Sequence, residues 1–205
     1  MLALDEEPIP SEPDRPDVTR SVALQGVAKA MYNDTSWPQL SEALAAAQEG
    51  EGLPLLELWD SYYNRNPDGT WPNFLEAFQT IVCMDDVERP TVDEDDATVE
   101  EYLAVAPRFA PNTTGSYFCS FYPVSESPRV DITGAGAGPI VVIGTTGDPA
   151  TPLASTRVMA QTLEDGRLVV VTADQHTGYG ETECGDEVVH RYLIDLVIPA
   201  EETDC

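Results

Sequence analysis

An acid and a histidine follow two apolar runs in the C-terminal part of the sequence. Asp148 comes shortly after the run 140–143, and His176 comes shortly after the run 168–171. Continuous β-branched runs of this kind are typical of parallel strands buried on both faces. The carboxyl ends of such strands meet at one edge of a sheet, where α/β folds place their sites. An acid and a histidine base at this edge would be two of the three members of a Ser-His-Asp triad, whose order along the chain is Ser, Asp, His.

The third member of such a triad has no candidate in these 205 residues, because no Gly-x-Ser-x-Gly elbow occurs in them. We therefore expect the chain to be the back half of a serine hydrolase. The nucleophile would come from an N-terminal hydrolase half, upstream in the same polypeptide or on a separate chain. Asp174 is a rival acid on the same loop as His176, while His190 is expected at the surface, away from the apolar stripe of the last helix.

The apolar pattern predicts a strand, a helix, a second strand and a final helix between residues 139 and 197. The first of these helices is expected at about 153–164. Two strands do not make a stable parallel sheet, since they would leave backbone groups unpaired at an edge. The pattern thus requires a partner sheet on the N-terminal side, independently of the missing serine.

Helical periodicity rich in aromatic residues extends over residues 18–83. The acidic stretch 85–101 is expected to be a solvated loop leading into a helix at about 97–108, with a calcium site as the alternative. We predict three parts: a flexible lead-in rich in acids and proline at 1–17, a helical cap or lid at 18–130, and an α/β part at 131–205. The fold class is α/β, with the last two parallel strands of a hydrolase sheet preceded by an α-helical cap.

The formal net charge of −27 is the most unusual feature of the composition. A solvated acidic surface explains it, and a field that attracts cationic substrates or the free amino end of a peptide is the functional alternative. Phosphates would be repelled, so a nucleic-acid partner is not expected. No apolar run approaches the roughly 20 residues of a membrane span. The segment 64–69 imitates the start of a calcium loop, but Leu75 stands where the bidentate acid belongs, so the segment is predicted to be a plain turn. The main interpretation of the sequence includes no metal site and no cofactor.

The four cysteines are widely spaced and none forms a C-x-x-C pair, so a zinc site is not expected. An even number suits two disulfides and an oxidising compartment, although four free thiols are an alternative. Three pairings are possible. The local pairing, Cys83 with Cys119 and Cys184 with Cys205, is favoured.

These residues together resemble the C-terminal region of the tripeptidyl-aminopeptidase-like α/β-hydrolases, which are secreted or envelope-bound serine peptidases. Three cap motifs add to the match: Trp37-x-x-Leu40, Ile81-Val82-Cys83-x-Asp85, and Cys119-x-x-Tyr122-Pro123, where the family has Trp in place of Tyr122. Gln175 stands where the family often has Gly. The matching positions of the C-terminal part are Gly144, Gly147, Asp148, Pro149, Thr151, Pro152, His176, Thr177, Cys184, Tyr192, Leu193, Pro199 and Cys205.

The resemblance implies that His176 is the general base and that Asp148 fixes its tautomer. It also implies that the helical part covers a peptide substrate and that an acid holds the substrate's amino terminus. Glu181, in the histidine loop, is the candidate for that acid. The resemblance implies a secreted or envelope location. An esterase or lipase of the same fold and a non-catalytic peptide-binding remnant are the alternative functions.

Overall fold

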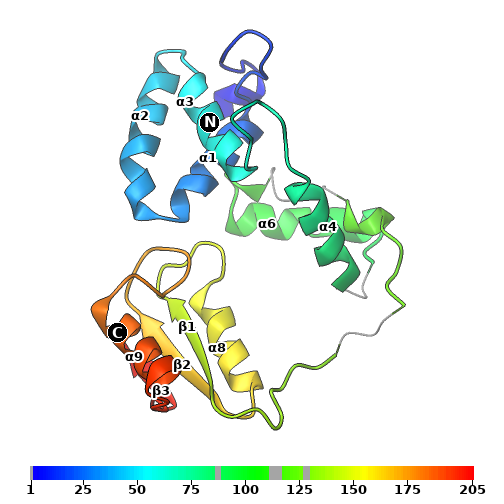
Figure 1. The fold of residues 1–205 in the computed structure, drawn as a ribbon. Helices are drawn as coiled ribbons and strands as arrows, with labels where there is room; N and C mark the ends of the chain where they lie inside the picture. The colour runs from blue at the N-terminus through cyan, green and yellow to red at the C-terminus, as the bar shows by residue number, and fades with distance from the viewer. Residues whose placement is uncertain (1, 86–88, 111–116, 127–129) are drawn as a thin grey trace. The chain divides into compact units, whose positions relative to one another are not determined.

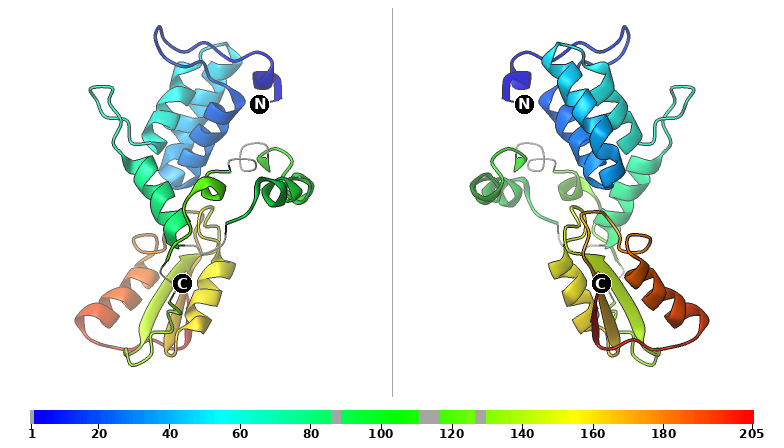
Figure 2. Two further views of the ribbon diagram at one scale, coloured as in Figure 1. Left: turned by 90° about the vertical axis from the view of Figure 1, so that its right-hand side faces the viewer. Right: turned by 90° about the vertical axis from the view of Figure 1, so that its left-hand side faces the viewer.

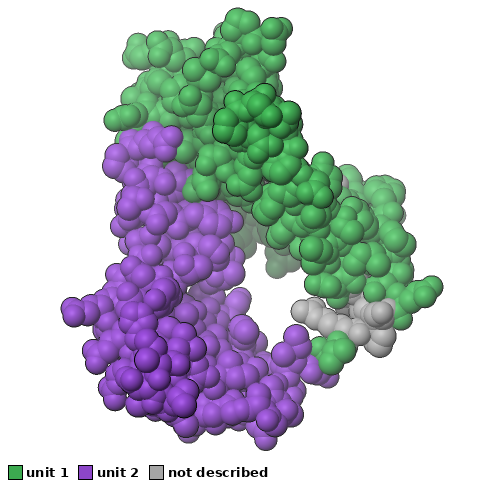
Figure 3. Space-filling view, in the orientation of Figure 1, with its two compact units in different colours: residues 1–29, 40–130 green, residues 30–39, 131–205 purple. Residues whose placement is uncertain are grey.

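The computed structural model describes residues 2–85, 89–110, 117–126 and 130–205. They form two compact units, drawn in different colours in Figure 3. One unit, here the helical unit, comprises residues 1–29 and 40–130, and the other, here the sheet unit, comprises residues 30–39 and 131–205. Among the described residues, no helix has both the length and the apolar character that a bilayer crossing needs.

The helical unit begins with a short 3-10 helix, η1 (Leu2–Asp5), and contains the four long helices that the periodicity predicts. These are α1 (Arg20–Met31), α2 (Trp37–Gln48), α3 (Leu53–Tyr62) and α4 (Phe74–Asp85), although the end of α1 and the start of α2 fall within residues 30–39 of the sheet unit. Their core contains Ala23, Ala43, Leu55 and Leu56, all fully or almost fully buried. Gly26 lets α1 approach α3, since a Cβ at this position would lie 2.9 Å from the carbonyl oxygen of Leu55.

The N-terminal segment is held by one contact within itself and by two contacts to α3. Ile9 and Val18 form an antiparallel bridge, Arg15 pairs with Asp60 at 2.6 Å, and the amide of Gly52 donates to the carbonyl of Pro10 at 3.0 Å. The division of the chain into a lead-in, a cap and an α/β part stays a prediction. Residues 30–39, assigned to the cap in that division, pack with residues 131–205.

The acidic stretch after α4 contains two short helices, α5 (Val92–Ala97) and α6 (Val99–Val105). The helix α6 lies within the range of about 97–108 expected for a helix but is shorter, whereas α5 lies in the stretch expected to be a loop. A capping box explains the start of α5, because the Thr91 hydroxyl accepts from the amide of Glu94 and the Glu94 carboxylate accepts from the amide of Thr91. The two reciprocal bonds satisfy backbone donors at the beginning of α5, and the break between the helices falls at Thr98.

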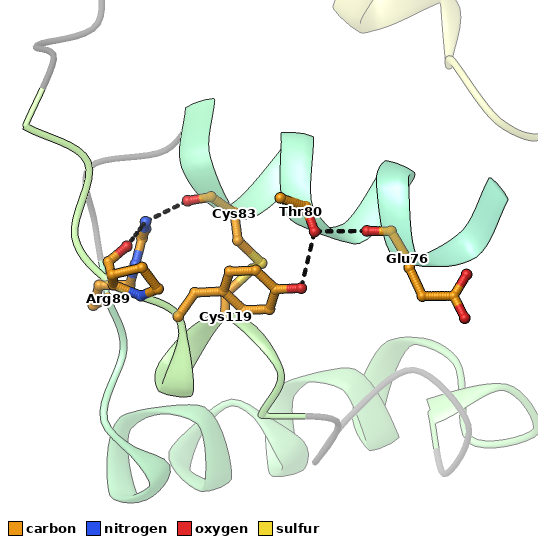
Figure 4. The surroundings of a disulfide bond; sticks show 7 residues. Glu76, Thr80, Cys83, Arg89 and Cys119 are labelled. Atoms are coloured by element: carbon orange, nitrogen blue, oxygen red, sulfur yellow. Dashed lines mark hydrogen bonds between the residues drawn. A yellow bond between two sulfur atoms is a disulfide. The ribbon is translucent and has the colours of Figure 1, made fainter. Parts of the chain in front are cut away.

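A disulfide joins Cys83 of α4 to Cys119 of the short 3-10 helix η3 (Cys119–Phe121). Figure 4 shows its surroundings. The guanidinium of Arg89 donates to the carbonyl of Cys83 and, at 3.0 Å, to that of Pro123. The Thr80 hydroxyl lies 3.1 Å from the Tyr122 hydroxyl. These bonds add polar cross-links beside the covalent one, so α4 and the η3 segment are fastened together at several points.

The sheet unit contains three parallel strands in the order β1 (Ile140–Thr145), β2 (Gly166–Val171) and β3 (Glu202–Asp204). The helices α8 (Leu153–Thr162) and α9 (Glu183–Ile194) lie on opposite faces of this sheet (Figures 1 and 2). A small apolar core lies between α8 and the sheet and consists of Val142, Ala160, Leu163, Leu168 and Val170. The short 3-10 helix η2 (Asp34–Ser36) also belongs to this unit.

The strand β3 is a correction to the two strands expected from the sequence. It has three residues, all polar, so it carries no apolar signal. The disulfide Cys184–Cys205 explains its position, because it attaches the last residue of the chain to the first turn of α9. The amide of Cys205 donates to the carbonyl of Val170 at 2.7 Å and continues the ladder to β2.

Candidate active site

The carboxylate of Asp148 lies in the turn between β1 and α8, where it accepts hydrogen bonds from the chain that follows it. Oδ1 accepts the amides of Ala150 and Thr151 at 2.8 Å each, and Oδ2 accepts the Thr151 hydroxyl at 2.8 Å. An Asx turn of this kind is encoded locally by the sequence Asp-Pro-Ala-Thr. It fixes the direction of the carboxylate before any distant contact forms.

The environment of Asp148 favours its charged form. Burial by itself raises the pKa of a carboxyl group, and the Asp148 side chain is only 2 % exposed. The amides of Thr151 and Ala150, the Thr151 hydroxyl and the His176 side chain outweigh this effect and hold the pKa of Asp148 well below its usual range. The site therefore contains a buried, ionised carboxylate at neutral pH.

His176 lies against this carboxylate. Its Nδ1 is 3.1 Å from Oδ1 and 3.1 Å from Oδ2 of Asp148. The His176 side chain is 29 % exposed, and its Nε2 makes no hydrogen bond to any residue that the structure describes. An ionised carboxylate at Nδ1 favours the tautomer that carries its proton there, which leaves Nε2 as an acceptor. The pair thus has the geometry of a histidine base with its orienting acid.

The loop that carries His176 is held from both sides. The hydroxyl of Thr145, fully buried at the end of β1, donates to the carbonyl of Gln175 at 2.5 Å. Thr177 has a φ of 77°, a region that non-glycine residues rarely adopt, and its amide donates to Oδ2 of Asp148 at 3.2 Å. The strained turn therefore brings the Thr177 amide to the same carboxylate that contacts Nδ1 of His176.

Among the described residues, none of the other site residues considered from the sequence is hydrogen-bonded to this pair. Asp174 is exposed and makes no hydrogen bond to His176 in the described part of the chain. His190 is exposed on α9, with its Nε2 2.8 Å from the Tyr179 hydroxyl. Glu181 is half-buried and lines a shallow acidic depression of about 600 Å³ at the start of α9. Its proposed contact with a substrate amine stays a prediction.

The structure joins the four cysteines in the pairing that the sequence favours, Cys83 with Cys119 and Cys184 with Cys205. No cysteine is free. Within the described ranges, no group of three or more His, Cys, Asp or Glu side chains could hold a metal ion.

Three residues that orient the pair were not assigned this role from the sequence. Thr151 belongs to the motif after Asp148, but its two bonds to the carboxylate depend on the turn geometry. Thr145 has a visible signal, as a polar residue at the end of an apolar strand. Tyr32 has none: its carbonyl accepts the amide of His176 at 3.0 Å, and a backbone contact between such distant residues leaves no mark in the sequence.

Comparison with known proteins identifies relatives of the chain. Residues 106–205 match a family model described as TAP-like protein. Carboxylesterase B of Mycobacterium tuberculosis (strain ATCC 25618 / H37Rv) is 33 % identical over 193 residues, which cover 89 % of this chain and 36 % of that protein. Serine protease Hip1 of the same strain is 30 % identical over 216 residues, which cover 95 % of this chain and 41 % of that protein.

The chain thus spans about two fifths or less of the length of these relatives. The family match covers the strands β1 to β3 and the helices α8 and α9, together with both residues of the acid–histidine pair. The parallel sheet with helices on both faces agrees with the fold class expected from the sequence. Residues 106–205 belong to the TAP-like family, and the chain contains the C-terminal part of an α/β-hydrolase fold.

Proposed function

We propose that the chain is the C-terminal region of a secreted or envelope-bound serine hydrolase, most specifically an aminopeptidase of the tripeptidyl-peptidase type. In this proposal, Asp148 and His176 are two members of the triad and the serine comes from an N-terminal hydrolase half. The observation that carries the proposal is the contact between a buried ionised carboxylate and Nδ1 of a partly exposed histidine. Two disulfides support an oxidising location.

The proposed chemistry follows from the two ring nitrogens of His176. Nε2 takes the proton of the serine hydroxyl while the serine oxygen attacks the substrate carbonyl, and it then returns that proton to the leaving amine or alcohol. A water molecule releases the acyl group by the same steps in reverse. Asp148 keeps the Nδ1 proton hydrogen-bonded and stabilises the imidazolium that forms between the steps.

Among the strands that the structure describes, β1 lies at an edge of the sheet, and this position supports a partner that continues the sheet. The amides of Ile140 and Thr146 donate to carbonyls of Asp165 and Val171, at 2.9 and 3.0 Å, and so face β2. In a parallel strand the backbone groups of alternate residues face opposite edges, so those of Val141, Ile143 and Thr145 face away from β2. We propose that a parallel strand of the nucleophile-bearing half pairs with this edge. We call the complex of this chain with that half the assembled hydrolase.

Peptides with a free amino end are the proposed substrates. The similarity to a protein named as a serine protease supports a peptide substrate. The net charge of −27, with Glu181 in the histidine loop, supports attraction of an amine. An ester is the second candidate substrate, and the similarity to a protein named carboxylesterase B favours it. Both substrates would use the same acid–histidine pair.

The proposal is tested first by reading the coding sequence next to that of this chain. We expect a Gly-x-Ser-x-Gly elbow in frame upstream or in a neighbouring gene. The purified assembled hydrolase should cleave tripeptidyl or aminoacyl p-nitroanilides with a higher kcat/KM than p-nitrophenyl butyrate. The reverse order favours the esterase, and no turnover of either class contradicts the hydrolase proposal.

The 205-residue chain alone provides the matched control. We expect it neither to hydrolyse these substrates nor to be labelled by a serine-reactive phosphonate. Phosphonate-sensitive turnover by this chain alone would show that it contains an unrecognised nucleophile and that the division of the triad is wrong.

A further inference from the structure

Tyr32 contacts both the main chain and the ring of His176, although it lies near the beginning of the sequence. Its carbonyl oxygen accepts the His176 amide at 3.0 Å. Its ring meets the imidazole edge to face, with centroids 5.1 Å apart and planes at 82°. Both residues belong to the sheet unit. One residue therefore constrains the position of His176 and the orientation of its imidazole.

We propose that Tyr32 is a positioning residue for His176, an inference that rests on the proposed role of His176 as the base. The contact with Asp148 leaves one motion of the imidazole open. Nδ1 is equally distant from both carboxylate oxygens, at 3.1 Å, and this is longer than the 2.7–2.9 Å of a strong charge-assisted bond. Such a forked bond fixes the position of Nδ1 better than it fixes the plane of the ring.

The ring of Tyr32 supplies the missing constraint. Edge-to-face aromatic contacts have a preferred geometry and contribute beyond the burial of area. A tyrosine ring at 82° to the imidazole opposes rotation about the bond that joins the imidazole to Cβ. Since 29 % of the His176 side chain is exposed, protein contacts on the remaining faces determine where Nε2 points. Tyr32 thus keeps Nε2 directed toward the nucleophile while Asp148 holds Nδ1.

The segment around Tyr32 is built to hold this position. Tyr32 directly follows the last residue of α1. Asn33 caps the next short helix η2 (Asp34–Ser36), because its side-chain oxygen accepts the amide of Thr35 at 2.9 Å. The chain direction on both sides of Tyr32 is therefore fixed by local structure, so its carbonyl and ring reach His176 from a defined main-chain position.

Histidine NMR of the ¹⁵N-labelled 205-residue chain tests the contact directly, because the chain contains only two histidines. We expect the wild type to show a protected Nδ1–H resonance for His176. Tyr32→Leu should broaden or abolish this resonance and leave His190 unchanged, whereas Tyr32→Phe, which keeps ring and carbonyl, should preserve it. A His176 resonance unchanged in Tyr32→Leu would overturn the proposal.

The second histidine provides a matched control. The ring of His190 meets Tyr179 edge to face, with centroids 5.7 Å apart and planes at 75°. The Tyr179 hydroxyl also lies 2.8 Å from Nε2 of His190. Because Tyr179→Phe removes this hydroxyl, it should alter the His190 resonances and leave those of His176 unchanged. Thermal unfolding establishes that each variant is folded. If Tyr32→Leu fails to fold, Tyr32→Met replaces it, because methionine is apolar and has no ring. The same loss or broadening of the His176 resonance is expected for this variant.

Activity of the assembled hydrolase separates this inference from the proposed function. Tyr32→Leu should lower kcat roughly three- to tenfold with KM nearly unchanged, and Tyr32→Phe should stay within about twofold of the wild type. If Asp148→Asn and His176→Ala abolish turnover while Tyr32→Leu does not lower it, only the role of Tyr32 is wrong. If His176→Ala retains full activity, the proposed function itself is wrong.

Discussion

Replacing Asp148 by asparagine removes one charge from the most highly connected side chain of the site. An asparagine oxygen at the place of Oδ1 can still accept the amides of Ala150 and Thr151, at 2.8 Å each. At the place of Oδ2 an NH₂ group meets donors, namely the Thr177 amide at 3.2 Å and the Thr151 hydroxyl at 2.8 Å. The backbone amide of Thr177 then has no acceptor, whereas the Thr151 hydroxyl can rotate and accept from the NH₂ group.

The expected cost follows from these contacts. Hydrogen bonds to a charged acceptor contribute about 1.5–3 kcal/mol each, and a buried donor left without a partner has a similar cost. With one such bond lost outright and a second weakened, Asp148→Asn should lower the free energy of unfolding by about 2–4 kcal/mol at pH 7. Asp174→Asn, on the same side of the sheet but exposed, is the matched control and should stay within about 0.5 kcal/mol.

Urea unfolding followed by circular dichroism measures both variants, and its pH dependence adds a second check. The folded pKa of Asp148 lies below its unfolded value of about 3.9. The stabilisation from ionisation of Asp148 is therefore complete above the unfolded pKa, and it is lost as the pH falls from that value toward the folded pKa. The difference between wild type and Asp148→Asn should shrink below about pH 4. Equal stabilities at pH 7, or a difference that grows on acidification, would refute the reasoning.

Three further predictions concern the parts of the fold that hold this pair. Cys205→Ser removes the bond to Cys184, which closes a sequence separation of 21 residues, and should lower stability by about 3 kcal/mol in non-reducing urea unfolding. Gly166→Ala places a Cβ 2.0 Å from a backbone carbonyl oxygen of α8 and should destabilise by more than about 2 kcal/mol, whereas Gly138→Ala, with open space, should change little. Thr145→Val leaves the half-buried carbonyl of Gln175, in the histidine loop, without its donor and should cost about 1–3 kcal/mol, with a lower kcat of the assembled hydrolase.

The acid–histidine pair could be predicted because its position depends on strong and local signals. The apolar runs 140–143 and 168–171 identify buried strands, and Asp148 and His176 each follow one of them by a few residues. Parallel pairing of β1 with β2 then brings the two loops to one edge of the sheet. The disulfides were favoured for a similar reason, since each joins cysteines within one region of the sequence.

The features that the sequence did not reveal depend on contacts between distant residues. The strand β3 is short and polar, and its pairing with β2 accompanies the attachment of Cys205 to α9. Residues 30–39 follow a helical pattern with the cap, yet they pack with residues 131–205. Tyr32 contributes its backbone carbonyl, a group that every residue has, so no residue type could indicate this contact.

The role of His176 as the base of a serine hydrolase is the central claim, and comparison of the two histidines tests it most directly. The measurement is kcat/KM of the assembled hydrolase with His176→Ala and, separately, with His190→Ala, on the better of the peptide and ester substrates. We predict a loss of about 10⁴-fold or more for His176→Ala, because the serine then lacks its proton acceptor, and a change of less than about twofold for His190→Ala. A His176→Ala enzyme that retains more than about a tenth of the wild-type kcat/KM would contradict the claim.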